Sequence, residues 1–516
     1  LPETTPLDSA EKKNQRHFVQ VQSLLPRCRL VSFSKRIREF GGNKMAPLIW
    51  SFILVTVLIG FSHTVEDNRC YGPPAPCICQ GVIIDCSYKN FHTIPRLIDQ
   101  SDRYDVLNLG GNALNQIPGR TFENITVHTI RLNNCNLGTI DENAFAGTEQ
   151  YLTSLDLRDN LLGGHGRGLP TALVHLSKLQ YLDVSGNGFH SRDYSDYVMR
   201  SIGASVTTFI FGDSVALTEW PSSLRHLQQL MTLDVEGGIL PFLPADAFHG
   251  FEVTLRNLTF NNVNTYAVPL GIASLRNLDE LHLDNLKGFS DSSLIEQPFQ
   301  GVGRTLRILS LRNDGLTVFP VVIKHLFNLK ELSLDGNKLE FISDESIALL
   351  QQRDVTFLSL KSCDLSRVPG AISNIHGLRT LDLSNNKITS IEQNDLYNMA
   401  NLNNLSLAGN PLEYVSNKSF SGLNRLESMD LSSTSLTLIS QAIEHLQGLV
   451  ILDLTNNKID CTCDLVWLKR FLVCTGRTIT ILGNCETIYM GIEDYVNTFI
   501  PNCLAYRESI CYTSGG

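Results

Sequence analysis

One repeated pattern dominates this chain. The segments that begin at Leu329, Leu378, Leu402 and Leu449 all read LxxLxLxxNxL. Fifteen such units align by their first apolar residue, with successive starts 23 to 28 residues apart: Tyr104, Val127, Leu152, Leu179, Val206, Leu230, Leu255, Leu278, Leu306, Leu329, Val355, Leu378, Leu402, Leu426 and Leu449. A unit of this length cannot bury its apolar side chains alone, so neighbouring units must stack into a solenoid with a continuous core.

Each unit predicts one short strand followed by an inward turn. The alternating leucines of LxL point into the core, and stacking the units gives a parallel sheet that lines a concave surface. The asparagine at the ninth position can satisfy backbone groups at the turn through its amide. It forms a ladder of seven residues, Asn112, Asn160, Asn187, Asn337, Asn386, Asn410 and Asn457, and Cys135 and Cys363 stand at the same position, where we interpret them as buried thiols.

This asparagine ladder is interrupted in five consecutive units. The ninth position there holds Ser214, Gly238, Val263, Leu286 and Asp314. One interpretation is that these repeats have drifted and are looser. The other is a central segment of altered curvature that forms a partner site.

The units resemble leucine-rich repeats over about residues 104–472. This resemblance implies an α/β solenoid, a leucine-rich-repeat horseshoe of about fifteen repeats with disulfide-bonded caps. We assign the repeats to 104–459. The cysteines at 70–103, spaced C-x6-C-x-C-x6-C, resemble an amino-terminal cysteine-rich cap, and those at 460–511 resemble a carboxy-terminal cap, followed by a tail at 512–516.

The family resemblance also implies disulfide pairs. In the first cap these are Cys70–Cys79 and Cys77–Cys86, although the spacing alone allows three connectivities. In the second cap they are Cys461–Cys485 and Cys463–Cys503. The usual cap has four cysteines, so two further cysteines, for which we predict a Cys474–Cys511 bridge, leave this connectivity open. Zinc is a weaker alternative, because zinc sites favour CxxC spacing and a reducing compartment.

The segment after Met45 predicts entry into the secretory pathway. Residues 46–61 contain no charge, and a helix of sixteen residues is shorter than the hydrocarbon core of a membrane. We therefore predict a signal peptide at 45–63, with a signal anchor as the alternative, and interpret 1–44 as a non-native or untranslated leader. Nothing after residue 65 is apolar for long enough to span a bilayer, so we expect an extracellular, secreted protein, or a cell-surface protein if the chain is truncated.

Four sequons agree with an extracellular location. They predict glycosylation at Asn124, Asn257, Asn404 and Asn417. Asn257 and Asn404 are third in their repeats, on strands of the concave sheet. Sugars at these two positions would displace binding to an edge or to repeats without sugar.

Catalytic and cofactor motifs are lacking. The sequence has no HExxH, GxSxG or P-loop, and the glycine-rich run at 163–168 lacks a phosphate-binding lysine. We therefore expect no enzyme activity, no cofactor and no metal. The net charge of −10 argues against nucleic acid as the partner.

Acidic residues recur on the predicted concave face. Aspartate stands at the fifth position of six repeats, at 156, 183, 234, 382, 430 and 453, where solvated carboxylates are one sufficient explanation. The other is a patch that attracts a cationic partner. For this patch we predict that partner binding depends on Asp234, Glu236, Asp279, Glu280 and Asp284.

Three functions fit these observations. The first is a secreted or cell-surface binding protein that recognises a protein or glycan through its concave or edge surface. The second is a truncated ectodomain that resembles Toll-like receptors or Slit-type proteins. The third is a non-catalytic subunit of a secreted enzyme complex, since the repeat style resembles the repeat-bearing subunit of shrimp secreted luciferase. The ligand depends on surface residues that a repeat pattern does not specify.

Overall fold

The computed structural model describes residues 77–95, 103–123, 125–476, 478–504 and 506. All of them belong to the second of two compact units, Glu66–Gly516. The predicted leader, signal peptide and carboxy-terminal tail lie outside the described residues, as do Cys70, Cys511 and Asn124.

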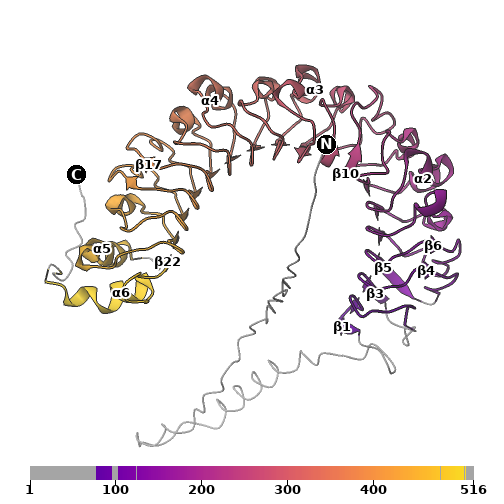
Figure 1. Cartoon of the computed structure of the whole chain (residues 1–516), viewed down its shortest axis with the longest axis horizontal. Helices are drawn as coiled ribbons and strands as arrows, with labels where there is room; N and C mark the ends of the chain where they lie inside the picture. Colours follow the sequence, from indigo (N-terminus) through magenta and orange to yellow (C-terminus); the bar gives the residue numbers. More distant parts are fainter. Residues whose placement is uncertain (1–76, 96–102, 124, 477, 505, 507–516) are drawn as a thin grey trace, which may run out of the picture. The chain divides into compact units, whose positions relative to one another are not determined.

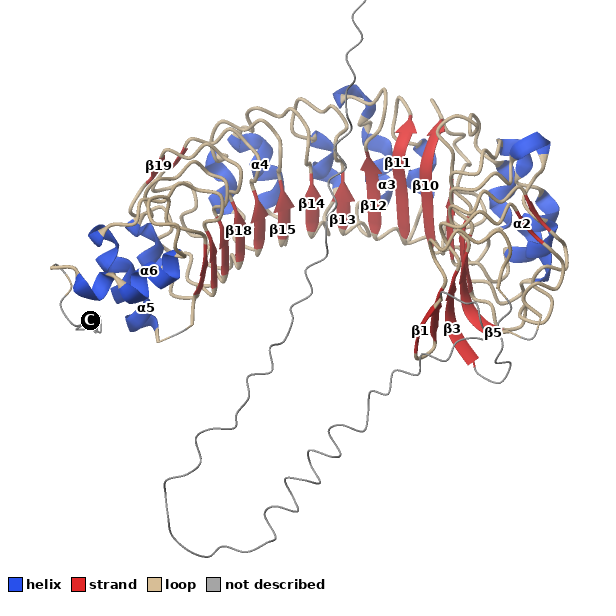
Figure 2. Ribbon diagram, turned by 60° about the horizontal axis from the view of Figure 1, so that its bottom comes forward, coloured by secondary structure: helices blue, strands red, loops and turns tan. Residues whose placement is uncertain are grey.

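One long sheet with a strand in every repeat forms the core of this unit (Figures 1 and 2). Fifteen parallel strands begin within two residues of the fifteen predicted repeat starts, which confirms the solenoid. They pair in chain order and are β3 (Arg103–Asn108), β5 (Thr126–Arg131), β7 (Ser154–Asp156), β8 (Tyr181–Asp183), β9 (Thr208–Phe211), β10 (Thr232–Ile239), β11 (Asn257–Asn264), β12 (Glu280–Asp284), β13 (Ile308–Ser310), β14 (Glu331–Ser333), β15 (Phe357–Ser359), β16 (Thr380–Asp382), β18 (Asn404–Ser406), β20 (Ser428–Asp430) and β21 (Ile451–Asp453).

The middle apolar residue of each strand, a leucine in most repeats, is buried against its neighbours. Leu332 of β14, for example, lies in register with Leu309 and Leu358, and none of the three is exposed. Residues on either side of the leucine face the concave surface, because side chains alternate along a strand. The repeat pattern therefore decides both the core and the surface that is free to bind.

Short helices and two strand pairs form the outer side of the arc (Figures 1 and 2). Ser195 and Ser343 cap α2 and α4 by accepting hydrogen bonds from Val198 N and Ser346 N. The α-helices of the repeats are α2 (Asp196–Ile202), α3 (Glu296–Val302) and α4 (Asp344–Gln351). The strand pairs are β4 (Gln116–Ile117) with β6 (Thr139–Ile140) and β17 (Ser390–Ile391) with β19 (Tyr414–Val415). The 3-10 helices are at Gly164–Gly166, Thr171–His175, Ser191–Asp193, Ser222–His226, Leu270–Ser274, Asp291–Ser293, Val321–His325, Gly370–Asn374 and Gln441–His445.

The asparagine ladder holds successive turns together. Asn160 Oδ1 accepts hydrogen bonds from the backbone N–H groups of Cys135 and Leu137, at 2.9 Å each, while Asn160 Nδ2 donates to Leu132 O and Leu157 O at 2.8 Å. The two cysteines of the ladder are buried free thiols, as predicted. Cys135 donates through Sγ to Leu109 O at 3.2 Å, so a thiol supplies one of the hydrogen bonds that an amide otherwise makes.

At two of the positions that lack the ladder asparagine, Gly238 and Val263, the strands continue. β10 and β11 are each eight residues long, and their pairing runs past the ladder position, through Gly238 with Val263 and Ile239 with Asn264. Without an amide to hold the inward turn, the backbone groups pair instead with the neighbouring strand. The interruption therefore widens the sheet at β10 and β11, where Figure 2 shows the longest central arrows.

The predicted interruption at Asp314 is wrong. Asp314 is buried, and its Oδ1 accepts a hydrogen bond from Leu286 N at 2.9 Å, as a ladder asparagine would. Asp314 N in turn donates to Asn337 Oδ1 at 3.1 Å. The ladder is thus interrupted in four repeats, at positions 214 to 286, because the carboxyl group of Asp314 retains an oxygen that accepts as the amide oxygen does.

Disulfides fasten both ends of the described chain. At the start, β1 (Ile78–Gln80) pairs antiparallel with β2 (Ile83–Asp85), β2 pairs with β3, and Cys77 is bonded to Cys86. At the end, β22 (Thr480–Leu482) follows β21 in the sheet beside α5 (Val466–Thr475), α6 (Ile492–Thr498) and the 3-10 helices Cys463–Leu465 and Ile500–Asn502.

Two further bridges, Cys461–Cys485 and Cys463–Cys503, join these terminal elements. Together with Cys77–Cys86, these are the three of the five expected pairs whose two cysteines both lie among the described residues, and all three are confirmed. Cys79 and Cys474 are also disulfide-bonded, and their expected partners lie outside the described residues.

Candidate functional site

An open acidic hollow of about 560 Å³ lies on the concave side of β8, β9 and β10. Its volume falls within the range of ligand sites in proteins, roughly 300–1,000 Å³. Four carboxylates and one guanidinium stand among the residues that line it: Arg158, Asp159, Tyr181, Asp183, Ser185, Gly186, Ile210, Asp213, Ser214, Val215, Glu236, Gly237 and Asn262.

The interrupted ladder shapes this acidic hollow. Gly237, with φ of 80°, lies against the turn of the preceding repeat, and a Cβ there would come within 2.8 Å of Ser214 Oγ. In that turn Asp213 accepts hydrogen bonds from the N–H groups of Val215 and Ala216, both at 2.9 Å, and from Gly188 N at 3.0 Å. Asp213 therefore serves as the local backbone acceptor in a repeat that lacks the asparagine.

Burial raises the pKa values of two side chains that line the hollow, Asp183 and Tyr181. Asp183 is only 2% exposed, and burial raises its pKa to about 6 even though Ser185 donates two hydrogen bonds to its Oδ1. Burial also raises the pKa of Tyr181 to about 12, and the charge of Asp183 adds to this shift. Tyr181 is thus a neutral phenol beside a carboxyl group that titrates near neutral pH.

Glu236 forms the far wall of the hollow. Its pKa is raised by burial and by the charge of Asp234, and Asn261 Nδ2 donates to its Oε2 at 2.9 Å. The single lining cation, Arg158, lies on the opposite side, with Nε 3.7 Å from Asp159 Oδ2. Negative charge exceeds positive charge along the wall, so the hollow suits a cationic group.

The five predicted partner-binding residues do not all lie at the acidic hollow. Glu236 lines the acidic hollow, and Asp234 faces the same side of β10, two residues earlier. The other three lie at β12 and have partners within the chain. Asp279 pairs with Arg307, with Oδ2 3.4 Å from Nη1, and Glu280 accepts a hydrogen bond from Asn257 Nδ2 at 2.8 Å.

Asp284 has a structural role. Its Oδ1 accepts hydrogen bonds from Ser310 Oγ at 2.6 Å and from Arg312 N at 2.9 Å. We expect Asp284→Ala to lower the free energy of unfolding by about 1–2 kcal/mol, because it leaves a half-buried N–H without its acceptor. Asp279→Ala removes a half-exposed ion pair and should change it by less than about 0.5 kcal/mol. Equal losses in urea unfolding would contradict this assignment.

Of the thirteen residues that line the hollow, the sequence prediction named only Glu236 as partner-binding, and Tyr181 and Asn262 are among those it omitted. Tyr181 stands one residue before the second apolar position of its repeat, Leu182, so the strand pattern already predicts that it faces the concave side. Asn262 lies within β11, with φ of 56°, at a point where the regular pattern predicts that the strand has ended. Only the extension of β10 and β11 brings Asn262 to the hollow.

The three predicted glycosylation sites among the described residues are not part of the acidic hollow. Asn257 is half-buried at the start of β11, and Asn404 is exposed on β18. Asn417 is exposed on the outer side, just after β19. None of these three residues lines the hollow, so sugars there would leave its lining residues unmodified.

Among the described residues, no group of three or more His, Cys, Asp or Glu is arranged to hold a metal ion. No helix there has the length and apolar character needed to cross a membrane.

Comparisons with known proteins agree with the repeat architecture. The family model "Leucine rich repeat" matches residues 125–189, 353–412 and 400–459. The volume-regulated anion channel subunit LRRC8B of Mus musculus is 30% identical over 217 residues, which cover 40% of this chain and 26% of that protein. Leucine-rich repeat-containing protein 3B of Mus musculus is 33% identical over 172 residues, or 32% of this chain and 59% of that protein.

A solved structure shares the fold over most of the chain. It is a leucine-rich-repeat protein of Leptospira interrogans, with a TM-score of 0.54, 24% identity, and coverage of 77% of this chain and 94% of that one. The chain spans less than two thirds of the length of the two curated relatives above, so their activities do not transfer to it. The chain thus contains leucine-rich repeats at the matched residues, and its described repeats fold as a solenoid with one parallel strand per repeat.

Proposed function

We propose that this protein is an extracellular, non-catalytic binding protein that seats a protein partner on its concave face at β8–β12. The acidic hollow supports this proposal. It is an open cavity in which four carboxylates face one guanidinium, so the partner would place a basic side chain there. The concave residues around it belong to rigid strands, which limits the ordering cost of binding.

Secretion is part of the proposal. Its support is the apolar segment at 46–61, the four sequons and the disulfides at both ends of the solenoid, which need an oxidising compartment. A receptor ectodomain and a non-catalytic subunit of an enzyme complex would use the same face. The nature of the captured partner distinguishes these two roles.

The first test is affinity capture with a charge-reversed variant. The full chain, secreted by cultured insect cells and immobilised, is exposed to extracellular fluid, and bound proteins are identified by mass spectrometry. We expect Glu236→Lys to reduce capture of the specific partner at least about tenfold, because it puts a cation into the acidic hollow. The matched control is Glu413→Lys, on the outer side of the solenoid.

Partners that both variants retain are not specific to the hollow. The proposal fails if every partner captured by the unmodified chain is retained by Glu236→Lys. It also fails if Glu413→Lys loses the same partners, because the effect would then be one of net charge.

A further inference from the structure

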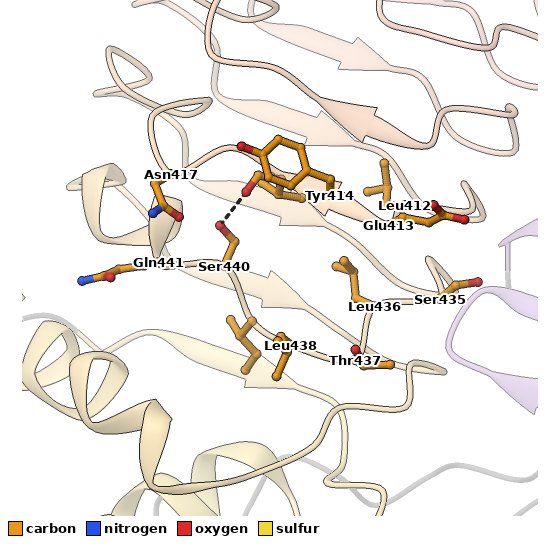
Figure 3. Close-up of a pocket in the computed structure, with 12 residues that line it drawn as sticks. Leu412, Glu413, Tyr414, Asn417, Ser435, Leu436, Thr437, Leu438, Ser440 and Gln441 are labelled. Atoms are coloured by element: carbon orange, nitrogen blue, oxygen red, sulfur yellow. Dashed lines mark hydrogen bonds between the residues drawn. The ribbon is translucent and has the colours of Figure 1, made fainter. Parts of the chain in front are cut away.

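A second cavity, the lateral slot, lies on the outer side between β19 and residues 435–441 (Figure 3). Its volume is about 500 Å³, and Leu412, Glu413, Tyr414, Val415, Asn417, Ser435, Leu436, Thr437, Leu438, Ile439, Ser440 and Gln441 line it. The slot is unrelated to the acidic hollow, with which it shares no residue.

The slot exists because two neighbouring repeats follow different outer paths. β19 pairs through one edge with β17, with Ser390 opposite Tyr414 and Ile391 opposite Val415. The next repeat enters the 3-10 helix Gln441–His445 instead of forming a third strand. Two hydrogen bonds join these repeats at the slot: Ser440 Oγ donates to Val415 O at 3.3 Å, drawn as the dashed line in Figure 3, and His445 Nε2 lies 3.1 Å from Asn417 O.

Large apolar side chains remain uncovered at this slot. Tyr414 is 53% exposed and Leu438 is 62% exposed. Asn417 also lines the slot, is exposed, and begins the sequon Asn417-Lys418-Ser419 three residues after Tyr414. Figure 3 places its amide at the same end of the slot as Gln441 and Ser440, with Tyr414 beside it.

We infer that Asn417 carries an N-linked glycan whose first sugars lie in the lateral slot, against Tyr414 and Leu438. A sugar attached to the Asn417 amide begins at the wall of the cavity, so this glycan is the occupant that we infer for the slot. The ring C–H groups of an N-acetylglucosamine pack on an aromatic face, and its hydroxyl groups can pair with Ser440 and Gln441. This glycan would be a part of the folded solenoid and not a free surface chain.

The modification itself uses a lipid-pyrophosphate-linked oligosaccharide as donor. Asn417 Nδ2 forms a bond to the anomeric carbon of the sugar, the bond from that carbon to the pyrophosphate oxygen breaks, and Nδ2 loses one proton. This inference rests on passage through the secretory pathway, which belongs to the proposed function, but not on the acidic hollow or its partner.

The test compares the rate of enzymatic glycan release at two sites of one protein. The full chain, secreted by insect cells, is treated in its native state with peptide N-glycosidase, and release is followed site by site by mass spectrometry. Asn404, exposed on the concave strand β18, is the internal reference. We expect release at Asn417 to be at least about fivefold slower than at Asn404, because the slot shields the linkage.

The variant Tyr414→Ala removes one wall of the slot and should bring the two rates within about twofold of each other. Tyr397→Ala is the matched control, since Tyr397 is 52% exposed on the outer side but does not line the slot. Asn417→Gln should lower the melting temperature by about 2 °C, whereas Asn404→Gln should not.

The outcomes separate this inference from the proposed function. Equal release rates in the unmodified chain, or sugar at Asn404 with none at Asn417, overturn the glycan assignment and leave the hollow untouched. Absence of sugar at both sites of the secreted chain overturns the glycan assignment alone, whereas a chain that the cells fail to secrete overturns the secretion on which the assignment rests. A Tyr397→Ala effect equal to that of Tyr414→Ala also overturns it.

Discussion

Replacing Asp314 with asparagine is expected to stabilise the solenoid, and to do so more at about pH 8 than at about pH 5. Asp314 is 1% exposed, and its Oδ2 has no hydrogen-bond partner among the described residues. Burial raises its pKa to about 8, and the charge of Asp284 adds to the shift. Folding thus favours the protonated form of this side chain.

The sign of the pH dependence follows from the two pKa values. The folded value, about 8, is above the ordinary value of 3.8, so the contribution of Asp314 to stability is complete below about pH 4. It is lost as the pH rises from about 4 toward 8, because the carboxyl group ionises in the unfolded chain while the buried group stays protonated. At about 1.4 kcal/mol per pKa unit, Asp314→Asn should gain on the order of 3 kcal/mol more at pH 8 than at pH 5.

Hydrogen bonding adds to the gain in Asp314→Asn. Asn337, one repeat later, donates through Nδ2 to Leu311 O at 2.6 Å and to Leu334 O at 2.8 Å. The equivalent acceptors for an amide at position 314 are the carbonyls of Leu283 and Leu311. Urea unfolding of both proteins at the two pH values measures the effect.

The reciprocal change serves as the control. Asn337→Asp introduces a carboxyl group into a regular ladder position and should be more destabilising at pH 8 than at pH 5. If Asp314→Asn changes the free energy of unfolding equally at both pH values, burial of an ionisable Asp314 is the wrong explanation.

The sequence was sufficient for the repeat architecture but not for its irregular centre. Leucines such as Leu309, Leu332 and Leu358 recur at the same place in successive units, and only one stacking buries all of them. By contrast, the missing amide at Gly238 and Val263 predicted a changed turn in these repeats. It did not predict whether the strands would end earlier or continue. The extension occurs because backbone groups of β10 and β11 that lack a partner at the turn pair with each other. This pairing is a contact between repeats, which the pattern within one repeat does not specify.

The candidate site, too, was only partly predictable from the sequence. The acidity of the concave face at Asp183, Asp234 and Glu236 was readable from the strand pattern. The hollow was not, because it depends on the extension of β10 and on the turn at Asp213. Asp314 was misjudged because the pattern compared residue names, whereas the ladder requires an acceptor oxygen that aspartate and asparagine share.

Neutralising the acidic hollow with amides of nearly the same shape is the prediction with the largest effect on binding. In Asp159→Asn/Asp183→Asn/Glu236→Gln the side-chain oxygens can still accept from Ser185 and Asn261, so the fold should be kept. Affinity for the captured partner should fall roughly 30-fold at about 50 mM NaCl. At about 500 mM NaCl the difference should shrink several-fold, because salt screens the lost charges.

The pH dependence of binding supplies an independent measurement of the same site. The pKa of Asp183 is raised to about 6, so this carboxyl group is charged above pH 6 and neutral below it. Affinity of the unmodified chain for a cationic partner should therefore decrease as the pH falls from about 7 to 5, while Asp183→Asn should show a smaller decrease.

The matched control for the triple variant of the hollow is Glu392→Gln/Glu413→Gln/Asp460→Asn. It removes three exposed charges far along the chain and should bind like the unmodified protein at both salt concentrations. Equal losses in the two triple variants would assign the effect to net charge, and the acidic hollow would no longer be the binding site.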